Sequence, residues 1–190
     1  MNELYFAPWF HKNNFIMLHT ILRYGIISGL IVASLMFITQ MTILGLSVQK
    51  ETFDYGMIIG YTTIFLASMA IYYAVRHYRD VKNENQISFV QGLLIGLGVT
   101  LISCVFYSLM WMIIYYNFMP DFMDQYASYS IEKMQKAGAT VDEINQFSKD
   151  LEGYKTMYKS PVNIFFLTMI EPLPVTFSVS LLSALILKRK

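Results

Sequence analysis

Four long segments of the chain consist almost entirely of apolar residues. They span residues 24–46, 55–75, 89–117 and 162–187, and only the fourth contains a charged residue, Glu171. A helix needs about 20 apolar residues to cross a hydrocarbon core of roughly 30 Å. The pattern therefore predicts an all-α membrane protein with a bundle of four transmembrane helices.

These segments lack the polar stripe that a soluble helix presents to water. Such a stripe places polar residues on one face at every third or fourth position. Residues 26–37 and 92–102 show no stripe of this kind. Composition agrees, because 55% of the residues are hydrophobic and 14% are charged, against about 25% charged in soluble domains. Both observations favour helices that face lipid over a soluble helical bundle.

Charge and cysteine content narrow the classes of function. A net charge of +1 provides no basic surface for a nucleic acid. Cys104 is the one cysteine, which excludes an internal disulfide, and the three histidines have no metal-ligand spacing. The sequence contains no readable pair of nucleophile and base and no phosphate-binding loop. We therefore predict no enzyme activity, catalytic residue, metal site or cofactor.

The segment before the first span does not resemble a cleavable signal. Residues 1–22 lack a compact basic region followed by a short apolar run. We expect an uncleaved cytoplasmic or interfacial segment over 1–22 and a single membrane domain over 23–190.

Basic residues are distributed unevenly between the two ends of the predicted bundle. One side holds the N-terminal segment, the loop after the second span and the C-terminus, with eight Lys or Arg and three acids. The other side holds six basic residues and nine acids, most of them in the long loop 119–161. Short basic loops stay in the cytoplasm. The distribution predicts that both termini are cytoplasmic.

The long loop is predicted to fold as an extracytoplasmic amphipathic helical hairpin over about 120–159. Apolar residues recur at helical spacing on both sides of Gly138, which suits the left-handed residue that follows a helix. Thr140 and Glu143 match a capping box at the start of the second helix. Residues 160–161, Ser-Pro, are expected to end the segment. The apolar faces can pack on each other, lie on the membrane or bind a partner, and the pattern leaves these alternatives open.

Small residues at four-residue spacing predict close helix contacts. In lipid, small residues allow two helix backbones to approach each other. The alternatives are packing within the bundle and self-association of two copies. The glycine pairs lie in the first three spans: Gly25 and Gly29, Gly56 and Gly60, and Gly92 and Gly96.

Glu171 is the residue with the strongest claim to chemistry. Acids inside spans are rare and costly, so they are candidates for function. Pro172 and Pro174 follow it directly and disfavour a continuous helix. Residues 174–187 alone make only about 21 Å of helix, so the fourth span must be kinked or broken. Glu171 is either a proton, ion or ligand site, or a structural residue that reaches water or hydrogen-bonds to the bundle.

Four stretches of the chain resemble a known family. They are RYGIISGL (23–30), YRDVKNENQISFVQG (78–92), YYNFMPDF (115–122) and SALILKRK (183–190). They resemble the DUF4199 family, a group of uncharacterised bacterial membrane proteins with a domain of unknown function. The resemblance covers roughly residues 22–190. It implies four spans, a charged loop between the last two and a location in the bacterial inner membrane, but no activity and no catalytic residues.

Two functions follow as hypotheses. The first is a non-enzymatic inner-membrane protein that packs with, or recruits, a protein partner through its outer hairpin or its small-residue faces. The second is a small transporter or permeation subunit that uses Glu171. In both, the lipid bilayer is the surrounding partner.

Overall fold

The computed structural model describes residues 7–45 and 52–189, and the elements in this part of the chain are helical. They are α1 (Ala7–Gly45), α2 (Thr52–His77), a π-helical turn η1 (Tyr78–Lys82), α3 (Phe89–Phe118), α4 (Phe122–Lys136), α5 (Val141–Met157), α6 (Pro161–Ile170) and α7 (Leu173–Leu187). The predicted all-α class is confirmed. The isolated bridge between Ile87 and Arg189 is the one β-type pairing among the described residues.

Three helices are long and apolar enough to cross a membrane, within Phe15–Thr42, Tyr55–Val81 and Phe89–Phe118. The pair α6 and α7 meets the same test together, as one span bent by 40°. The chain is thus a helical protein with the composition and helix lengths of a membrane protein.

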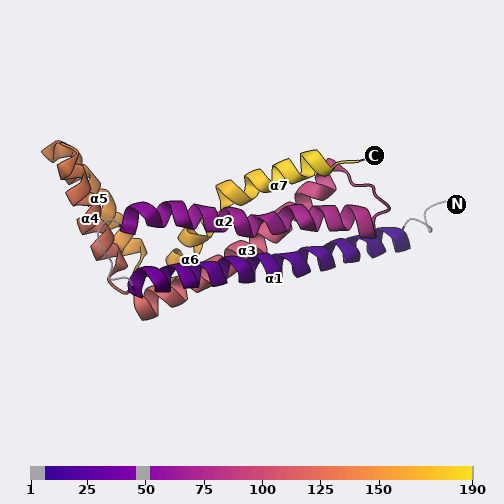
Figure 1. Cartoon of the computed structure of the whole chain (residues 1–190), viewed down its shortest axis with the longest axis horizontal. Coiled ribbons are helices and arrows are strands. Elements are labelled where there is room, and N and C mark those ends of the chain that lie inside the picture. Colours follow the sequence, from indigo (N-terminus) through magenta and orange to yellow (C-terminus); the bar gives the residue numbers. More distant parts are fainter. Residues whose placement is uncertain (1–6, 46–51, 190) are drawn as a thin grey trace.

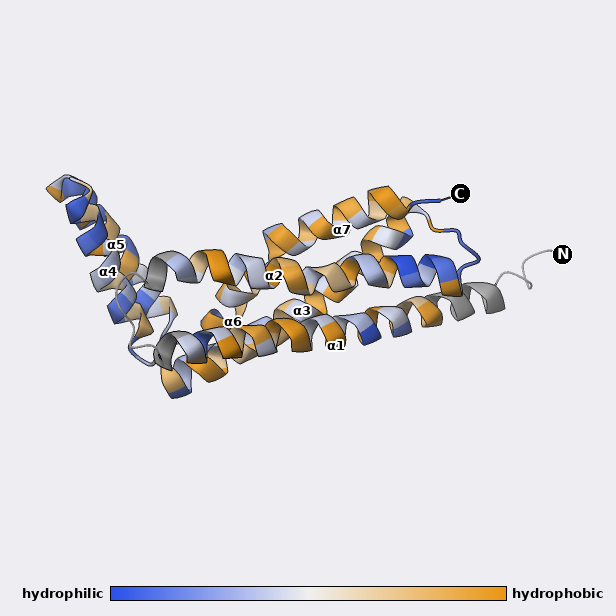
Figure 2. Cartoon of the chain, in the orientation of Figure 1, coloured by the Kyte–Doolittle hydropathy of each residue, from blue (hydrophilic) through white to orange (hydrophobic). Residues whose placement is uncertain are grey.

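The long helices run side by side with alternating direction (Figure 1). The closest pairs are α1 with α3 and α3 with α7, while α2 packs on α1 and α7. The end of α7 lies at the same end of the bundle as the start of α1, whereas α4 and α5 project from the opposite end (Figure 1). Apolar residues follow the length of the bundle, and hydrophilic residues gather at its two ends (Figure 2).

Helix α1 begins at Ala7, far ahead of the apolar run that starts at residue 24. The predicted boundary marks where charge disappears from the sequence, and Arg23 does not interrupt the helix. A charged residue that lies in water is compatible with a helical backbone. Hydropathy therefore locates the part of a helix that faces lipid, and the helix itself can extend beyond that part.

Four of the six predicted glycines lie at tight contacts between helices. A Cβ atom added to Gly96 of α3 would stand 2.7 Å from the Ser180 Cβ of α7. One added to Gly29 would stand 2.6 Å from the Phe106 ring, and Gly25 and Gly92 meet neighbours at 2.7 and 3.2 Å. A Cβ at Gly25, Gly29 or Gly96 would force its neighbour to move, and one at Gly92 would require a smaller shift, so α3 approaches α1 and α7 closely.

Gly56 and Gly60 do not make the helix contact predicted for them. Among the described residues, a Cβ added to either meets no heavy atom within 4 Å. Their spacing on α2 resembles that of the other pairs, but the described helices leave an open space beside them.

Buried hydroxyl groups reinforce the contacts between helices. The Ser28 hydroxyl of α1 donates a hydrogen bond to the Ala67 carbonyl of α2 at 3.0 Å. The hydroxyls of Thr100 and Ser180 lie 3.3 Å apart between α3 and α7. In an apolar surrounding, such groups need a partner inside the protein.

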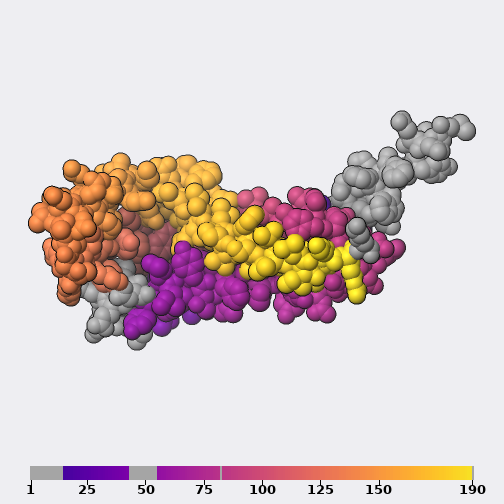
Figure 3. Space-filling view, turned by 90° about the horizontal axis from the view of Figure 1, so that it is seen from above, coloured from indigo at the N-terminus to yellow at the C-terminus, as the bar shows by residue number. Residues whose placement is uncertain are grey.

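Helices α4 and α5 form a block at the end of the bundle, beside α6 (Figure 3). We call them the α4–α5 pair. Gly138 has a φ of +79°, as predicted for the residue after a helix. Lys155 of α5 lies 2.8 Å from the Asp124 carboxylate of α4 and joins the two helices. The predicted capping box of Thr140 and Glu143 is confirmed.

Ser160 and Pro161 follow the end of the α4–α5 pair, as predicted, and they also begin the next helix. The Ser160 side chain caps α6 by accepting from the Asn163 amide, and Pro161 occupies the first turn. Proline suits this position because the first amides of a helix have no partner within it.

The opposite end of the bundle is tied together by backbone contacts. Ile87 and Arg189 exchange hydrogen bonds of 3.0 and 2.9 Å, which holds the C-terminal segment against the connection before α3. Ser88 and Gln91 form a second capping box at the start of α3. Its Ser-x-x-Gln signature is present in the sequence, but the apolar pattern alone did not single it out.

Replacing Gly96 by alanine should destabilise the bundle. The new methyl group meets Ser180 at a distance that requires the helices to move apart, and overpacking of this kind costs about 1–3 kcal/mol. Gly60→Ala is the matched control, since its methyl group enters open space. Thermal unfolding in mild detergent should show a lower transition for Gly96→Ala only. Equal transitions for both variants would show that α3 and α7 are not in close contact.

Replacing Thr140 by alanine should loosen the start of α5. The variant loses the hydroxyl that accepts from the Glu143 amide, and loss of such a cap costs about 1 kcal/mol. Hydrogen exchange in the first turn of α5 should quicken by about fivefold. Thr156→Ala, near the other end of α5, is the control because its hydroxyl bonds only within its own helix. Unchanged exchange in Thr140→Ala would contradict the cap.

The same turn should respond to acid. The Thr140 backbone amide donates to the Glu143 carboxylate at 2.7 Å, and this bond and the Thr140 hydroxyl lower the pKa of Glu143 below 4.5. A carboxyl with a lowered folded-state pKa adds stability above its unfolded pKa and loses it as the pH falls through the folded value. Backbone NMR shifts of residues 141–144 should therefore show fraying between neutral pH and about pH 3. Glu143→Gln should remove that dependence, and identical titrations of the two proteins would refute it.

Candidate functional site

A cavity of about 270 Å³ lies at the end of the bundle that carries the α4–α5 pair. Helices α1, α2 and α3 form its walls, and α4, Tyr158 and Glu171 complete them. The described lining residues are Met36, Thr39, Gln40, Gly56, Met57, Gly60, Thr63, Tyr107, Trp111, Met119, Phe122, Tyr126, Tyr158 and Glu171. Helices distant in sequence thus converge on one space.

The two glycines of α2 explain why this space is open. Gly56 and Gly60 both line the cavity, and a Cβ at either would meet nothing within 4 Å. A larger side chain at these positions would project toward the cavity. The glycine pair that the sequence assigned to helix packing therefore forms a cavity wall.

Glu171 lies at the break in the bent pair, as its neighbouring prolines predicted. Helix α6 ends at Ile170 and α7 begins at Leu173, with the Glu171 amide donating to the Thr168 carbonyl at 3.3 Å. Pro172 is buried, whereas Glu171 remains accessible and lines the cavity. The break thus places an acid at the wall of the cavity instead of inside a continuous helix.

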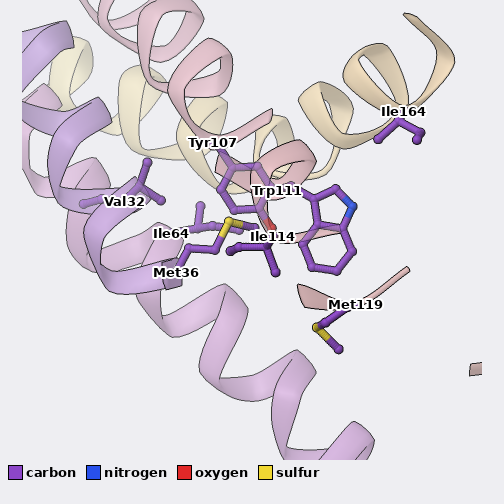
Figure 4. Close-up of a cluster of buried hydrophobic side chains, with 9 residues drawn as sticks. Val32, Met36, Ile64, Tyr107, Trp111, Ile114, Met119 and Ile164 are labelled. Carbon is purple, nitrogen blue, oxygen red and sulfur yellow. The ribbon is translucent and has the colours of Figure 1, made fainter. Parts of the chain in front are cut away.

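Tyr107 of α3 lies near Glu171. Its hydroxyl is close enough to interact with the carboxylate, and both side chains line the cavity. The Tyr107 side chain is only 5% exposed and belongs to a buried apolar cluster with Met36, Ile64 and Ile114. Figure 4 shows these side chains converging beside the tyrosine ring. Packing against α1 and α2 therefore holds the Tyr107 side chain in place beside Glu171.

Aromatic rings make up much of the remaining wall. Trp111 meets Phe122 edge to face with ring centroids 5.0 Å apart, and Phe122 stacks on Tyr126 at 6.1 Å. Tyr158 meets Tyr115 at 5.5 Å. These contacts join α3 to α4 on one side and to Tyr158, at the end of α5, on the other.

Tyr107 also borders a second, much smaller void of about 10 Å³. Serine and threonine side chains surround it, including Ser28, Ser68 and Thr176. The buried hydroxyl of Ser103 faces the same region without a hydrogen-bond partner. Apolar side chains, among them Val32 and Ile64, also line this void, and its surface is almost entirely apolar. The Tyr107 side chain thus borders both the large cavity and this smaller void.

The described residues contain no group of three or more His, Cys, Asp or Glu that could hold a metal ion. Cys104 is buried and free. The chemistry available at the cavity is that of one carboxylate, hydroxyl and amide groups, and aromatic faces.

Sequence reasoning located Glu171 and the break but missed most of the cavity. Trp111 belongs to an aromatic cluster that is typical of a membrane interface, and nothing in the pattern distinguishes Tyr107 within its apolar segment. Gly56 and Gly60 differ from the other glycine pairs only in which helix lies opposite them, and the spacing in the sequence does not show this.

Residues 23–189 match the model of a family described as protein of unknown function (DUF4199). The match covers most of the chain, so the chain belongs to this family. Comparisons with curated proteins and with solved structures find no match.

Proposed function

We propose that this member of the DUF4199 family is a non-enzymatic, four-span protein of the bacterial inner membrane that binds a small molecule beside Glu171. The observation that carries the proposal is the cavity of about 270 Å³ with an accessible acid in its wall. Retaining an acid near the membrane is costly unless it has a task or a partner. Ligand binding would be such a task for Glu171, whose side chain is accessible at the cavity wall.

The distribution of charge supports an outward-facing cavity. Arg76 lies in the last turn of α2, and Arg79 donates to the Leu187 carbonyl at the end of α7, just before Lys188 and Arg189. These ends of α2 and α7 lie opposite the α4–α5 pair (Figure 1). The positive-inside rule assigns that end to the cytoplasm. The α4–α5 pair is then an extracytoplasmic hairpin, and the cavity beside it faces the outer side, with both termini in the cytoplasm.

The described groups favour binding over catalysis. Glu171 lies near a tyrosine hydroxyl that is itself held by packing, and the described lining residues include no serine, cysteine, histidine or lysine. A single acid with a neutral partner can hold a charge or accept a hydrogen bond. Transport is an extension of the same proposal, because an acid such as Glu171 inside a membrane span commonly marks the path of a proton, ion or substrate.

The second candidate function is recruitment of a protein partner by the hairpin. Three apolar side chains of α5 are exposed: Val141 at 72%, Tyr154 at 53% and Met157 at 46%. Exposed apolar residues outside the membrane region support a contact surface. This function uses residues separate from the cavity, so replacing Tyr154 and Met157 by serine should weaken co-purification of a partner and leave the cavity intact.

Thiol labelling of Gly60→Cys in intact cells tests the cavity. A small, membrane-impermeant thiol reagent added from outside should label this cysteine, because position 60 lines a space open to the outer side. A thiol reagent carried on a large polymer should not, because the cavity admits only small molecules. Ile58→Cys is the control, since Ile58 lies on the same stretch of α2, is exposed on the isolated chain and does not line the cavity.

Wild-type protein provides the background, with the buried Cys104 as its one thiol. Labelling of Gly60→Cys only from the cytoplasmic side would contradict the orientation. Equal labelling at positions 58 and 60, or equal labelling by small and large reagents, would contradict a small-molecule cavity.

A further inference from the structure

The charged group in the cavity wall determines which sign of charge a ligand can carry. Glu171 is the one charged residue among the described residues that line it. A carboxylate repels anions and attracts cations, and both effects strengthen where water is partly excluded. Gln40 and Thr39 add neutral oxygen atoms to the same wall. The lining therefore favours a ligand that carries positive charge.

An inorganic divalent ion does not fit this set of groups. Calcium takes about six to eight oxygen ligands, and magnesium needs a near-octahedral set. The described chain has no cluster of three or more His, Cys, Asp or Glu residues. One carboxylate beside amide and hydroxyl groups is a weak site for such ions.

The aromatic wall fits an organic cation. The face of an aromatic ring carries partial negative charge and attracts ammonium groups, with tryptophan the strongest. Aromatic rings with a nearby carboxylate can therefore replace the water around a quaternary or protonated amine. Five aromatic side chains line the cavity: Tyr107, Trp111, Phe122, Tyr126 and Tyr158.

The volume limits the size of the ligand. Pockets for drug-sized molecules have about 300–1,000 Å³, and this cavity has about 270 Å³. It has room for a cationic head and a body of about one ring. Met36, Met57 and Met119 provide apolar, adaptable contacts for that body.

We propose that the cavity binds a small organic cation, an amine or quaternary ammonium with a compact apolar body, with its charge beside Glu171. This inference rests on the proposed function, because it names the ligand class of the same cavity. Glu171 supplies the charge, and the aromatic side chains surround the head group.

Two probes of equal shape and different charge test the ligand class. They are 4-(trimethylammonio)benzyl alcohol, a cation, and 4-tert-butylbenzyl alcohol, its neutral isostere. Trp111 reports binding by its fluorescence once Trp9→Phe has removed the other tryptophan. The protein is held in lipid nanodiscs. We expect the cation to bind about tenfold or more tightly than the neutral probe.

Glu171→Gln should remove this preference while binding of the neutral probe persists. Retained binding of the neutral alcohol shows that the variant is folded. Glu171→Asp should retain part of the preference, because the charge remains but is displaced. Asp142→Asn is the matched control, since it removes an exposed acid of α5 outside the cavity and should leave both affinities unchanged. Gly60→Leu should weaken both probes by filling the cavity.

Equal affinities of the two probes for the wild type, both lost in Gly60→Leu, would overturn the cation proposal and leave small-molecule binding in place. A preference for the cation that survives in Glu171→Gln would also overturn it, because the charge would then be recognised elsewhere. If neither probe changes the fluorescence of Trp111, the cation proposal is overturned as well. The proposed function is then decided separately, by thiol labelling of Gly60→Cys.

Discussion

A backbone amide in the hydrocarbon core must find its partner inside the protein, and this constraint shapes the fourth apolar segment. Pro172 and Pro174 have no amide hydrogen to donate. They stand at the very start of α7, where the first amides of a helix have no partner within it. The break therefore costs few hydrogen bonds. The Pro172 carbonyl accepts from the Thr176 amide at 3.0 Å and from the Thr176 hydroxyl at 2.9 Å, so hydrogen bonding resumes at once in α7.

The break has a consequence for the acid that precedes it. Glu171 keeps helical backbone angles at the end of α6, with φ −56° and ψ −48°, and α7 then leaves at 40°. The acid therefore stands at the corner between the two helices, at the wall of the cavity and near Tyr107. The close contacts of α3 with α1 and α7 keep these three helices tightly packed. The opening beside α2 therefore does not loosen the rest of the bundle.

Glycine has two opposite roles in this chain. Gly29 and Gly96 allow helices to touch, whereas Gly56 and Gly60 leave a space that no neighbouring side chain occupies. Both roles produce the same spacing in the sequence, so periodicity alone could not separate them. The helical segments, the cap at Thr140 and the break at Glu171 were predictable, because each depends on local chemistry. The cavity depends on which helices become neighbours, and a single sequence does not contain that information in a readable form.

The most direct measurement of the role of Glu171 is infrared difference spectroscopy of the protein in lipid, recorded before and after addition of the cationic probe. A cation held beside the carboxyl group changes the vibrations of that group. We expect a difference band in the carboxyl region that disappears in Glu171→Gln and persists in Asp142→Asn. The absence of that band in the wild type, or its persistence in Glu171→Gln, would contradict a cation site at the break in the fourth apolar segment.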